Sequence, residues 1–231
     1  MMRRALTLVV IVLFALIFLR IIMGYSELQT LRPLAAYFMT QGPIELGAPN
    51  IVTAILITYR GFDTLGEVAV LFMVAASVGA LLKEENGAAA NANGDAPLRE
   101  AGEIVRTGKQ VLLPIILTFG AYVIVNGHLS AGGGFQGGAI VASGVMLMLL
   151  SKPGATLNVA ALSILESTAG VIYVCIGILG LVFAGGFLDA RFLPRGQFGA
   201  FFSAGAIPLI SALLGVKVGA ELSVVIDRFR S

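Results

Sequence analysis

Charged residues are scarce in this sequence of 231 residues. Asp, Glu, Lys and Arg together make up 12% of it and hydrophobic residues 58%, whereas a soluble globular domain carries about 25% charged residues. The mean hydropathy is +0.95. Because too few polar side chains are present to cover a soluble domain, the composition excludes a soluble enzyme and predicts a chain surrounded by lipid.

Tryptophan is absent, and cysteine occurs once. Without tryptophan, contacts at the membrane interface must come from Tyr and Phe. The single Cys175 excludes a disulfide within the chain, and its apolar surroundings predict a small buried hydrophobe. A net charge of +2, with no basic stripe, gives no indication of nucleic acid as a partner.

Six apolar stretches are long enough to cross a bilayer, for which about 17–25 residues are needed. The first is longer than the apolar part of a secretory signal, about 7–15 residues, so we expect a retained helix. A shorter stretch, Ala48–Tyr59, predicts an interfacial or re-entrant helix with Pro49 in its first turn. The fold class is therefore all-α, a polytopic membrane protein of about six transmembrane helices, at residues 5–23, 64–82, 110–126, 135–151, 162–184 and 199–224.

The distribution of basic residues predicts that both termini lie in the cytoplasm, because Lys and Arg gather in cytoplasmic loops. With the N-terminus inside, the outer side receives Arg32, Arg60, Arg191 and Arg195. The cytoplasmic side then receives the larger set, Arg3, Arg4, Lys83, Arg99, Arg106, Lys109, Lys152, Arg228 and Arg230.

The segment 83–109 divides the chain. Its centre, residues 86–94, consists of Asn, Gly and Ala with nothing to bury, and predicts a flexible cytoplasmic linker. The division gives a two-helix module at 1–82 and a four-helix domain at 110–231. No internal repeat is visible, which argues against a self-contained secondary transporter.

Ionisable side chains inside apolar stretches cost about 2.5–3.5 kcal/mol each on insertion scales, so each needs a reason. Glu67 follows Arg60 and Asp63 at the start of the second stretch. It either completes a capping box with Thr64 or lies below the headgroups, where a carboxyl group could take up and release a proton.

Glu166 presents the same pair of alternatives. It fits a capping box with Ser163. If the helix instead begins near Asn158, Glu166 lies about two turns inside it, where a carboxylate is expected to have a function in ion movement.

Lys217 and Glu221 are four residues apart and therefore neighbours on one helix face. They are either charges that extend towards the cytoplasmic surface or a protonatable pair within a bundle. A seam of small residues is turned roughly 200° away from Lys217, at about 100° per residue, and predicts close packing on the opposite face; it consists of Ser211, Gly215 and Gly219.

A glycine-rich loop separates the third and fourth stretches. It begins at Gly127-His128, and its glycines allow tight turns and close helix approach. His128 titrates near neutral pH, as a proton relay requires, but a histidine at a helix end is also a common structural hydrogen-bonding residue. The glycines of the loop are Gly132, Gly133, Gly134, Gly137 and Gly138, and the small-residue positions continue to Ala142. No metal-ligand cluster, nucleophile–base pair, phosphate-binding loop or cofactor motif is present, so we predict no cofactor, no metal and no catalysis by this chain alone.

The loop motif resembles the signature of the B-type subunits of Mrp-type multisubunit sodium/proton antiporters, and the resemblance extends over about residues 105–228. Glu166 stands at the position of the glutamate that the family carries early in the next helix. Ala131 departs from the pattern, since the family usually has proline there.

The first part of the chain resembles a second module. Residues 47–56 (GAPNIVTAIL) and 60–67 (RGFDTLGE) are similar to the E-type subunits of membrane-bound energy-converting hydrogenases. The two resemblances imply a small subunit of a cation-translocating module, in a prokaryotic cell membrane, within a complex related to hydrogenases or sulfane reductases. Its partners would be other membrane subunits, Na+, H+ and the lipid bilayer.

The resulting hypothesis makes Glu67 the main ion carrier, with Asp63 and Arg60 adjusting its pKa. His128, Glu166, Lys217 and Glu221 would have secondary roles on the ion path. Two alternatives stay open: a structural subunit that only braces its larger neighbours, and a free-standing channel or carrier.

Overall fold

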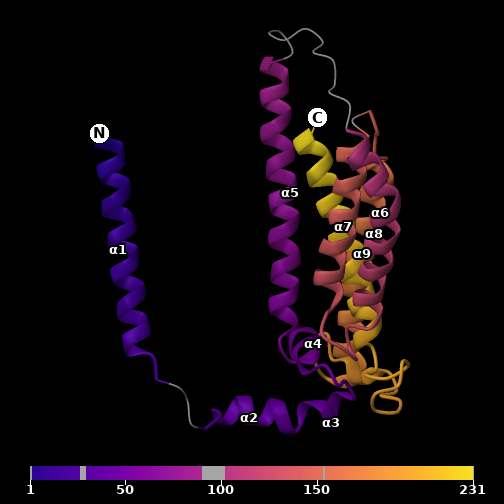
Figure 1. Cartoon of the computed structure of the whole chain (residues 1–231). Coiled ribbons are helices and arrows are strands. Elements are labelled where there is room, and N and C mark those ends of the chain that lie inside the picture. The colour runs from indigo at the N-terminus through magenta and orange to yellow at the C-terminus, as the bar shows by residue number, and fades with distance from the viewer. Residues whose placement is uncertain (1, 27–29, 90–101, 153, 231) are drawn as a thin grey trace. The chain divides into compact units, whose positions relative to one another are not determined.

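The structure is a computed structural model, which describes residues 2–26, 30–89, 102–152 and 154–230. All regular elements in these residues are helical, in agreement with the all-α prediction (Figure 1). They fall into two compact units, Met1–Ala36 and Tyr37–Ser231. The elements are α1 (Met2–Gly24), α2 (Pro33–Thr40), α3 (Gly42–Leu46), α4 (Ile51–Ala54), η1 (Ile55–Tyr59), α5 (Gly61–Ala89), α6 (Glu103–Val125), α7 (Gly134–Ser151), α8 (Val159–Ala184), η2 (Ala190–Phe192) and α9 (Ile207–Arg230).

Six helices of the described part of the chain are long and apolar enough to cross a membrane: α1, α5, α6, α7, α8 and α9. In the first unit, the candidate span Arg4–Gly24 has a mean hydropathy of 3.0, and none of it is buried within the chain. Apart from Arg20, its side chains from Ala5 to Met23 are apolar or uncharged on all sides, so its surroundings must be largely lipid or other apolar helices.

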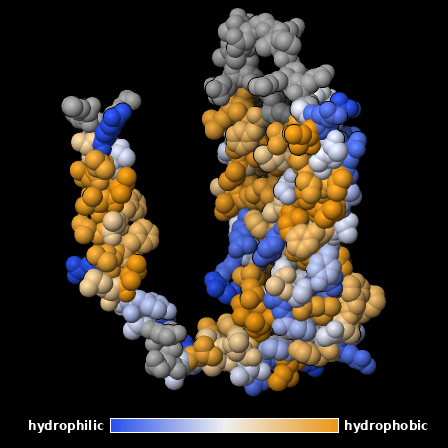
Figure 2. Space-filling view, in the orientation of Figure 1, coloured by the Kyte–Doolittle hydropathy of each residue, from blue (hydrophilic) through white to orange (hydrophobic). Residues whose placement is uncertain are grey.

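Helix α9 is the centre of the second unit. It packs against α5, α6, α7 and α8, which run alongside it (Figure 1). Of its membrane-spanning stretch, 61% is buried, compared with 11% for that of α5. The outer helices turn apolar side chains away from this core, and the visible face of the unit is largely hydrophobic (Figure 2). Such a surface is suited to lipid and not to water.

Helices α6 and α9 begin several residues away from the positions that the sequence suggested. Helix α6 begins at Glu103 and has 23 residues, so the expectation of a short span beginning at 110 was wrong. Helix α9 begins at Ile207, not at 199. The apolar residues before it form a loop, in which Gly196, Gly199 and Gly205 take left-handed backbone conformations with φ of 65°, 79° and 58° that a helix cannot contain.

The short stretch before α5 is built differently from the prediction. Asn50 is the N-cap of α4, and its Oδ1 accepts hydrogen bonds from the backbone N–H groups of Val52 and Thr53, at 3.2 and 3.4 Å. Pro49 therefore precedes the helix and does not lie in its first turn. After one turn the chain continues as the π-helix η1; such segments are rare and are frequent at functional sites.

The two predicted seams of small residues pack against each other. A Cβ atom on Gly134 would lie 2.1 Å from the carbonyl oxygen of Ser211, and one on Gly138 would lie 2.7 Å from that of Gly215. Because no side chain larger than hydrogen fits there, these glycines allow the backbones of α7 and α9 to approach closely.

Two further expectations, on the linker at 83–109 and on Cys175, differ from the structure. Helix α5 extends to Ala89 and α6 begins at Glu103, so both ends of the predicted 83–109 linker are helical, while residues 90–101 lie outside the described residues. Cys175 is exposed on α8, and the expectation that it is buried was wrong. The buried face of α8 includes Tyr173, Ile176 and Gly180. Cys175 lies between these positions in the sequence and belongs to the exposed face of the helix.

Candidate functional site

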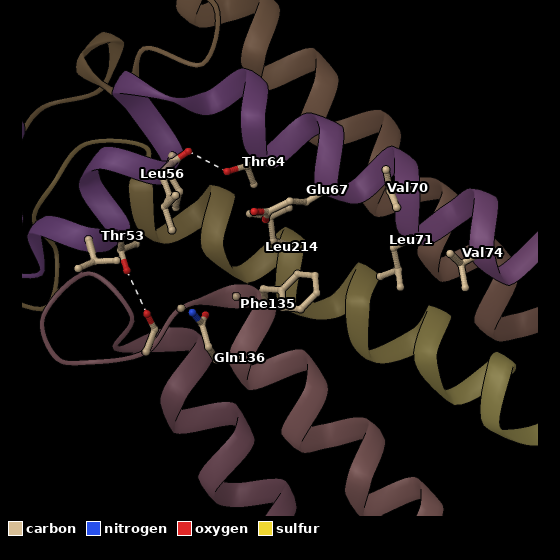
Figure 3. Close-up of a pocket in the computed structure, with 15 residues that line it drawn as sticks. Thr53, Leu56, Thr64, Glu67, Val70, Leu71, Val74, Phe135, Gln136 and Leu214 are labelled. Atoms are coloured by element: carbon tan, nitrogen blue, oxygen red, sulfur yellow. Dashed lines mark hydrogen bonds between the residues drawn. The ribbon is translucent and has the colours of Figure 1, made fainter. Parts of the chain in front are cut away.

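A cavity of about 630 Å³ lies beside Glu67 in the second unit. Its walls come from α4, η1, α5, the glycine loop, the first turn of α7 and Leu214 of α9. Figure 3 shows Glu67 directed from α5 towards Phe135 and Leu214. The other wall residues are mainly apolar, so Glu67 is the single ionisable group among the residues that line it.

The capping-box alternative for Glu67 does not describe its helix. Helix α5 begins at Gly61, so Thr64 is already within it. The Thr64 hydroxyl donates to the carbonyl oxygen of Leu56, at 2.8 Å, in the π-helical segment (Figure 3). Glu67 is therefore free of a cap role, and its side chain is exposed on the cavity wall in the isolated chain.

Arg60 and Asp63 form an ion pair with each other. Their side chains are 61% and 46% exposed, and neither residue lines the cavity of Glu67. An exposed pair of this kind contributes little to stability. The structure therefore brings two of the three predicted residues of this motif together and leaves Glu67 apart from them.

Glu166, Lys217 and Glu221 meet in the interior of the helix bundle. Lys217 Nζ lies 2.9 Å from Oε1 of Glu166 and 3.2 Å from Oε2 of Glu221, and donates a hydrogen bond to each. All three residues are buried. Lys217 also lies over the ring of Phe72 on α5, 5.8 Å from its centre. We call Glu166, Lys217 and Glu221 the charge triad.

The capping alternative for Glu166 and the snorkelling alternative for Lys217 both disagree with this geometry. Helix α8 begins at Val159, and its N-cap is Asn158, whose side chain accepts a hydrogen bond from Ala161 N at 3.0 Å. Glu166 therefore lies about two turns inside the helix. Lys217 does not extend to the surface, because it is held between two buried carboxylates.

His128 is buried beneath the loop that precedes α9. Its Nε2 lies 3.1 Å from the carbonyl oxygen of Phe201; since a carbonyl only accepts, this nitrogen carries the proton. Burial lowers the pKa of His128, although the hydrogen bond to Phe201 acts in the opposite direction. These contacts match the structural alternative, in which a neutral histidine fixes two loops together.

Asn50 holds the glycine loop against the first module and was not singled out by the sequence. Its Nδ2 donates to the carbonyl oxygens of Gly127 and Ser130, both at 2.7 Å. Its backbone N–H donates to the carbonyl oxygen of His128 at 3.0 Å, and the Thr53 hydroxyl donates to that of Gly132, also at 3.0 Å. The two sequence motifs that carry the two family resemblances are thus bound to each other.

Glu45 is a second group that the sequence analysis missed. The hydroxyls of Tyr37 and Tyr59 each donate to its carboxylate at 2.6 Å, and these two hydrogen bonds lower the pKa of Glu45. Arg195 donates to the carbonyl oxygens of Ile44 and Glu45, at 3.1 and 3.2 Å. The cluster ties α3 to η1 and to the loop before α9, and no local sequence pattern signals it.

No group of three or more His, Cys, Asp or Glu side chains within the described residues could hold a metal ion. What the arrangement offers instead is one carboxylate on a cavity wall and one buried charge triad. Carboxylates in such surroundings can bind a cation or exchange a proton.

Comparison with protein families identifies both modules. Residues 104–224, just over half of the chain, match the domain related to the MnhB subunit of Na+/H+ antiporters. The chain belongs to this family. Residues 2–94 match the E-type component of the membrane-bound hydrogenase MBH, the MbhE family. These matches confirm both family resemblances that the two sequence motifs indicated, one for each part of the chain.

Curated relatives include longer proteins. A probable K+/H+ antiporter protein of Rhizobium meliloti, which joins the A-type and B-type subunits, is 34% identical over 137 residues, which are 51% of this chain and 14% of that protein. An uncharacterised protein of Methanocaldococcus jannaschii is 29% identical over 197 residues, 76% of this chain and 74% of the relative. The chain therefore spans about a seventh of the antiporter protein and about three quarters of the Methanocaldococcus protein.

Two solved structures are similar to the whole chain. A chain from the membrane-bound sulfane sulfur reductase, an archaeal respiratory membrane complex, is 33% identical with a TM-score of 0.82, and the match covers 99% of this chain and 98% of that one. A chain of the Mrp complex from Dietzia sp. DQ12-45-1b has a TM-score of 0.74 at 22% identity, with 98% of this chain and 26% of that chain covered. The second comparison shows a shared fold.

Proposed function

We propose that this chain is a small, non-catalytic membrane subunit of a multisubunit Na+/H+ antiporter module within a redox-driven membrane complex. The similarity to one chain of the sulfane sulfur reductase complex, along nearly the full length of both, supports a complex of this kind. The matches to the MnhB-related domain and to the MbhE family support the antiporter part of the proposal.

The chain lies in the plasma membrane of a prokaryotic cell with both termini in the cytoplasm. In the predicted topology, more Lys and Arg residues lie on the side of the membrane that holds the N-terminus than on the other side, and this excess supports the orientation. Other membrane subunits of the complex cover the apolar outer faces of its helices, and the redox reaction takes place elsewhere in the complex.

In this proposal Glu67 is the main group that binds and releases the transported ion. The observation that supports this role is the cavity beside its side chain. A carboxylate within an apolar stretch is costly, and this one faces a space of about 630 Å³ instead of pairing with Arg60. In the assembled complex, water and a neighbouring subunit would complete this space. Glu67 would then bind and release Na+ or H+ on the path through the module.

A transport assay with the assembled complex tests this role. Glu67→Gln removes the charge and keeps the shape, so it should reduce cation-driven proton flux in sealed vesicles to background while the subunits still purify together. Glu103→Gln is the matched control, since Glu103 is exposed in the first turn of α6 and does not line the cavity. It should leave the flux unchanged.

The assay also distinguishes the alternative functions. A purely structural role predicts that Glu67→Gln changes assembly or stability while the flux per assembled complex stays as in the unaltered protein. A free-standing carrier predicts ion flux from this chain reconstituted alone, whereas the proposal predicts none.

A further inference from the structure

The hydroxyl group of Tyr173 is buried without a partner. Tyr173 lies on α8 and is 2% exposed, and its hydroxyl oxygen makes no hydrogen bond within the described part of the chain. A buried polar group without a partner destabilises a fold. Such a group therefore calls for an explanation, and a role in binding an ion is one of those known.

The packing of three helices fixes the level of Tyr173 along the bundle. Lys217 Nζ lies 5.8 Å from the ring centre of Phe72 on α5, and a Cβ atom on Gly170 of α8 would lie 3.8 Å from Cδ of Lys217. Helices α5 and α9 run in the same direction and α8 in the opposite one (Figure 1). One helical turn from these contacts, in the direction away from Glu221, the three helices carry Val68, Tyr173 and Leu214. All three of these residues belong to one buried core cluster.

Glu67 stands at the same level of the bundle. It directly precedes Val68 on α5, and its side chain is directed towards Leu214, which lines its cavity (Figure 3). Leu214 therefore belongs both to the wall of the cavity and to the core that contains Tyr173. In agreement with this placement, the charge of Glu67 acts through space on the phenol group of Tyr173. The carboxylate at the cavity and the unpartnered hydroxyl thus lie near each other on two different helices.

The other groups around Tyr173 are less suited to accept its proton. The remaining side chains of the core cluster are apolar. Lys217, one turn away, and Arg228, beyond it on α9, are donors only. The two carboxylates of the charge triad accept their hydrogen bonds from Lys217. Glu67 is therefore the carboxylate that the level of Tyr173 offers to its hydroxyl.

We propose that Tyr173 is a positioning residue of the ion site at Glu67. The Glu67 side chain is exposed and can change its rotamer, whereas the ring of Tyr173 is held by the core. When one carboxylate oxygen of Glu67 binds the ion, the other accepts a hydrogen bond from the Tyr173 hydroxyl, which keeps the carboxylate in place. An outer partner of this kind orients a ligand of a metal ion and raises its affinity. The inference rests on the proposed function, because it requires Glu67 to bind the transported cation.

Na+ titrations of the assembled complex in sealed vesicles test this role. Tyr173→Phe removes a single oxygen atom and keeps the ring. The Na+ concentration for half-maximal proton flux should rise about tenfold or more, since loss of an outer partner lowers metal affinity by about 10–100-fold, while the maximal flux stays the same. Tyr122→Phe is the matched control, because Tyr122 is 52% exposed on α6 and does not line the cavity. It should leave the titration unchanged.

Thermal unfolding of the same complexes separates this role from a structural one. Because Tyr173→Phe removes a buried hydroxyl without a partner, the unfolding temperature should stay the same or rise. A lower unfolding temperature, or a complex that no longer assembles, would show that the hydroxyl supports the fold and would overturn the inference. An unchanged half-maximal Na+ concentration in Tyr173→Phe, or an equal shift in Tyr122→Phe, would overturn it as well. Unchanged flux in Glu67→Gln would instead count against the proposed function.

Discussion

The side-chain amide of Asn50 donates a 2.7 Å hydrogen bond to the carbonyl oxygen of Gly127, 77 residues later in the chain. The same side chain is the N-cap of α4. One residue thus fixes the start of a helix in the first module and the conformation of the glycine loop in the second. The cavity of Glu67 has walls from both of these segments, so its shape depends on this junction.

Replacement of Asn50 should destabilise the junction. Asn50→Ala removes the cap and the bonds to the loop, and we expect a loss of about 2–4 kcal/mol, since each net hydrogen bond contributes about 0.5–1.5 and a cap about 1 kcal/mol. Asn158→Ala is the matched control, because Asn158 acts as a cap to Ala161 N and should cost only about 1 kcal/mol. Thermal unfolding of the two variants in detergent compares them, and equal losses would contradict the role of Asn50.

Close packing of α7 on α9 predicts a strict requirement for glycine at position 134. In Gly134→Ala the new methyl group would lie 2.1 Å from the backbone oxygen of Ser211, and the backbones must separate. Overpacking of this kind costs about 1–3 kcal/mol. Gly108→Ala adds the same methyl group to α6, where no atom lies within 4 Å, and should be neutral or slightly stabilising. The unfolding temperatures of the two variants give the comparison; a stable Gly134→Ala variant would show that the contact is not tight.

Burial of His128 predicts a stability that depends on pH. Burial lowers its pKa below the ordinary value of 6.5, so the unfolded chain binds a proton more readily than the folded chain. Stability is therefore complete above about pH 6.5 and is lost as the pH falls below it towards the folded pKa. Unfolding temperatures measured down through this range should decrease less in His128→Gln than in the unaltered chain. Equal decreases in the unfolding temperatures of His128→Gln and of the unaltered chain would show that groups other than His128 cause the pH dependence.

The sequence was sufficient to predict those features of the molecule that depend on local composition. Long apolar stretches predicted the spans, and ionisable residues within them identified Glu166, Lys217 and Glu221. The spacing of four residues between Lys217 and Glu221 predicted one contact of the triad. The other contact, to Glu166, joins α8 to α9 over 51 residues, and only the packing of the helices brings these residues together.

The errors have equally local causes. An apolar run from 199 suggested helix where glycines in left-handed conformations form a loop, and only Ile207 begins α9. Two capping-box patterns suggested helix starts at Thr64 and Ser163, although both helices begin earlier. Asn50 was missed because it donates to backbone carbonyl groups. Every residue type has such a group, so the residues that accept these bonds cannot be recognised in the sequence.

The most direct test of the central claim is a high-resolution structure of the complete complex in lipid, in which ordered water around Glu67 can be seen. The account predicts that the Glu67 carboxylate contacts water in a cavity shared with a neighbouring subunit. A Glu67 side chain packed against lipid chains or protein, with no water within hydrogen-bonding distance, would contradict it.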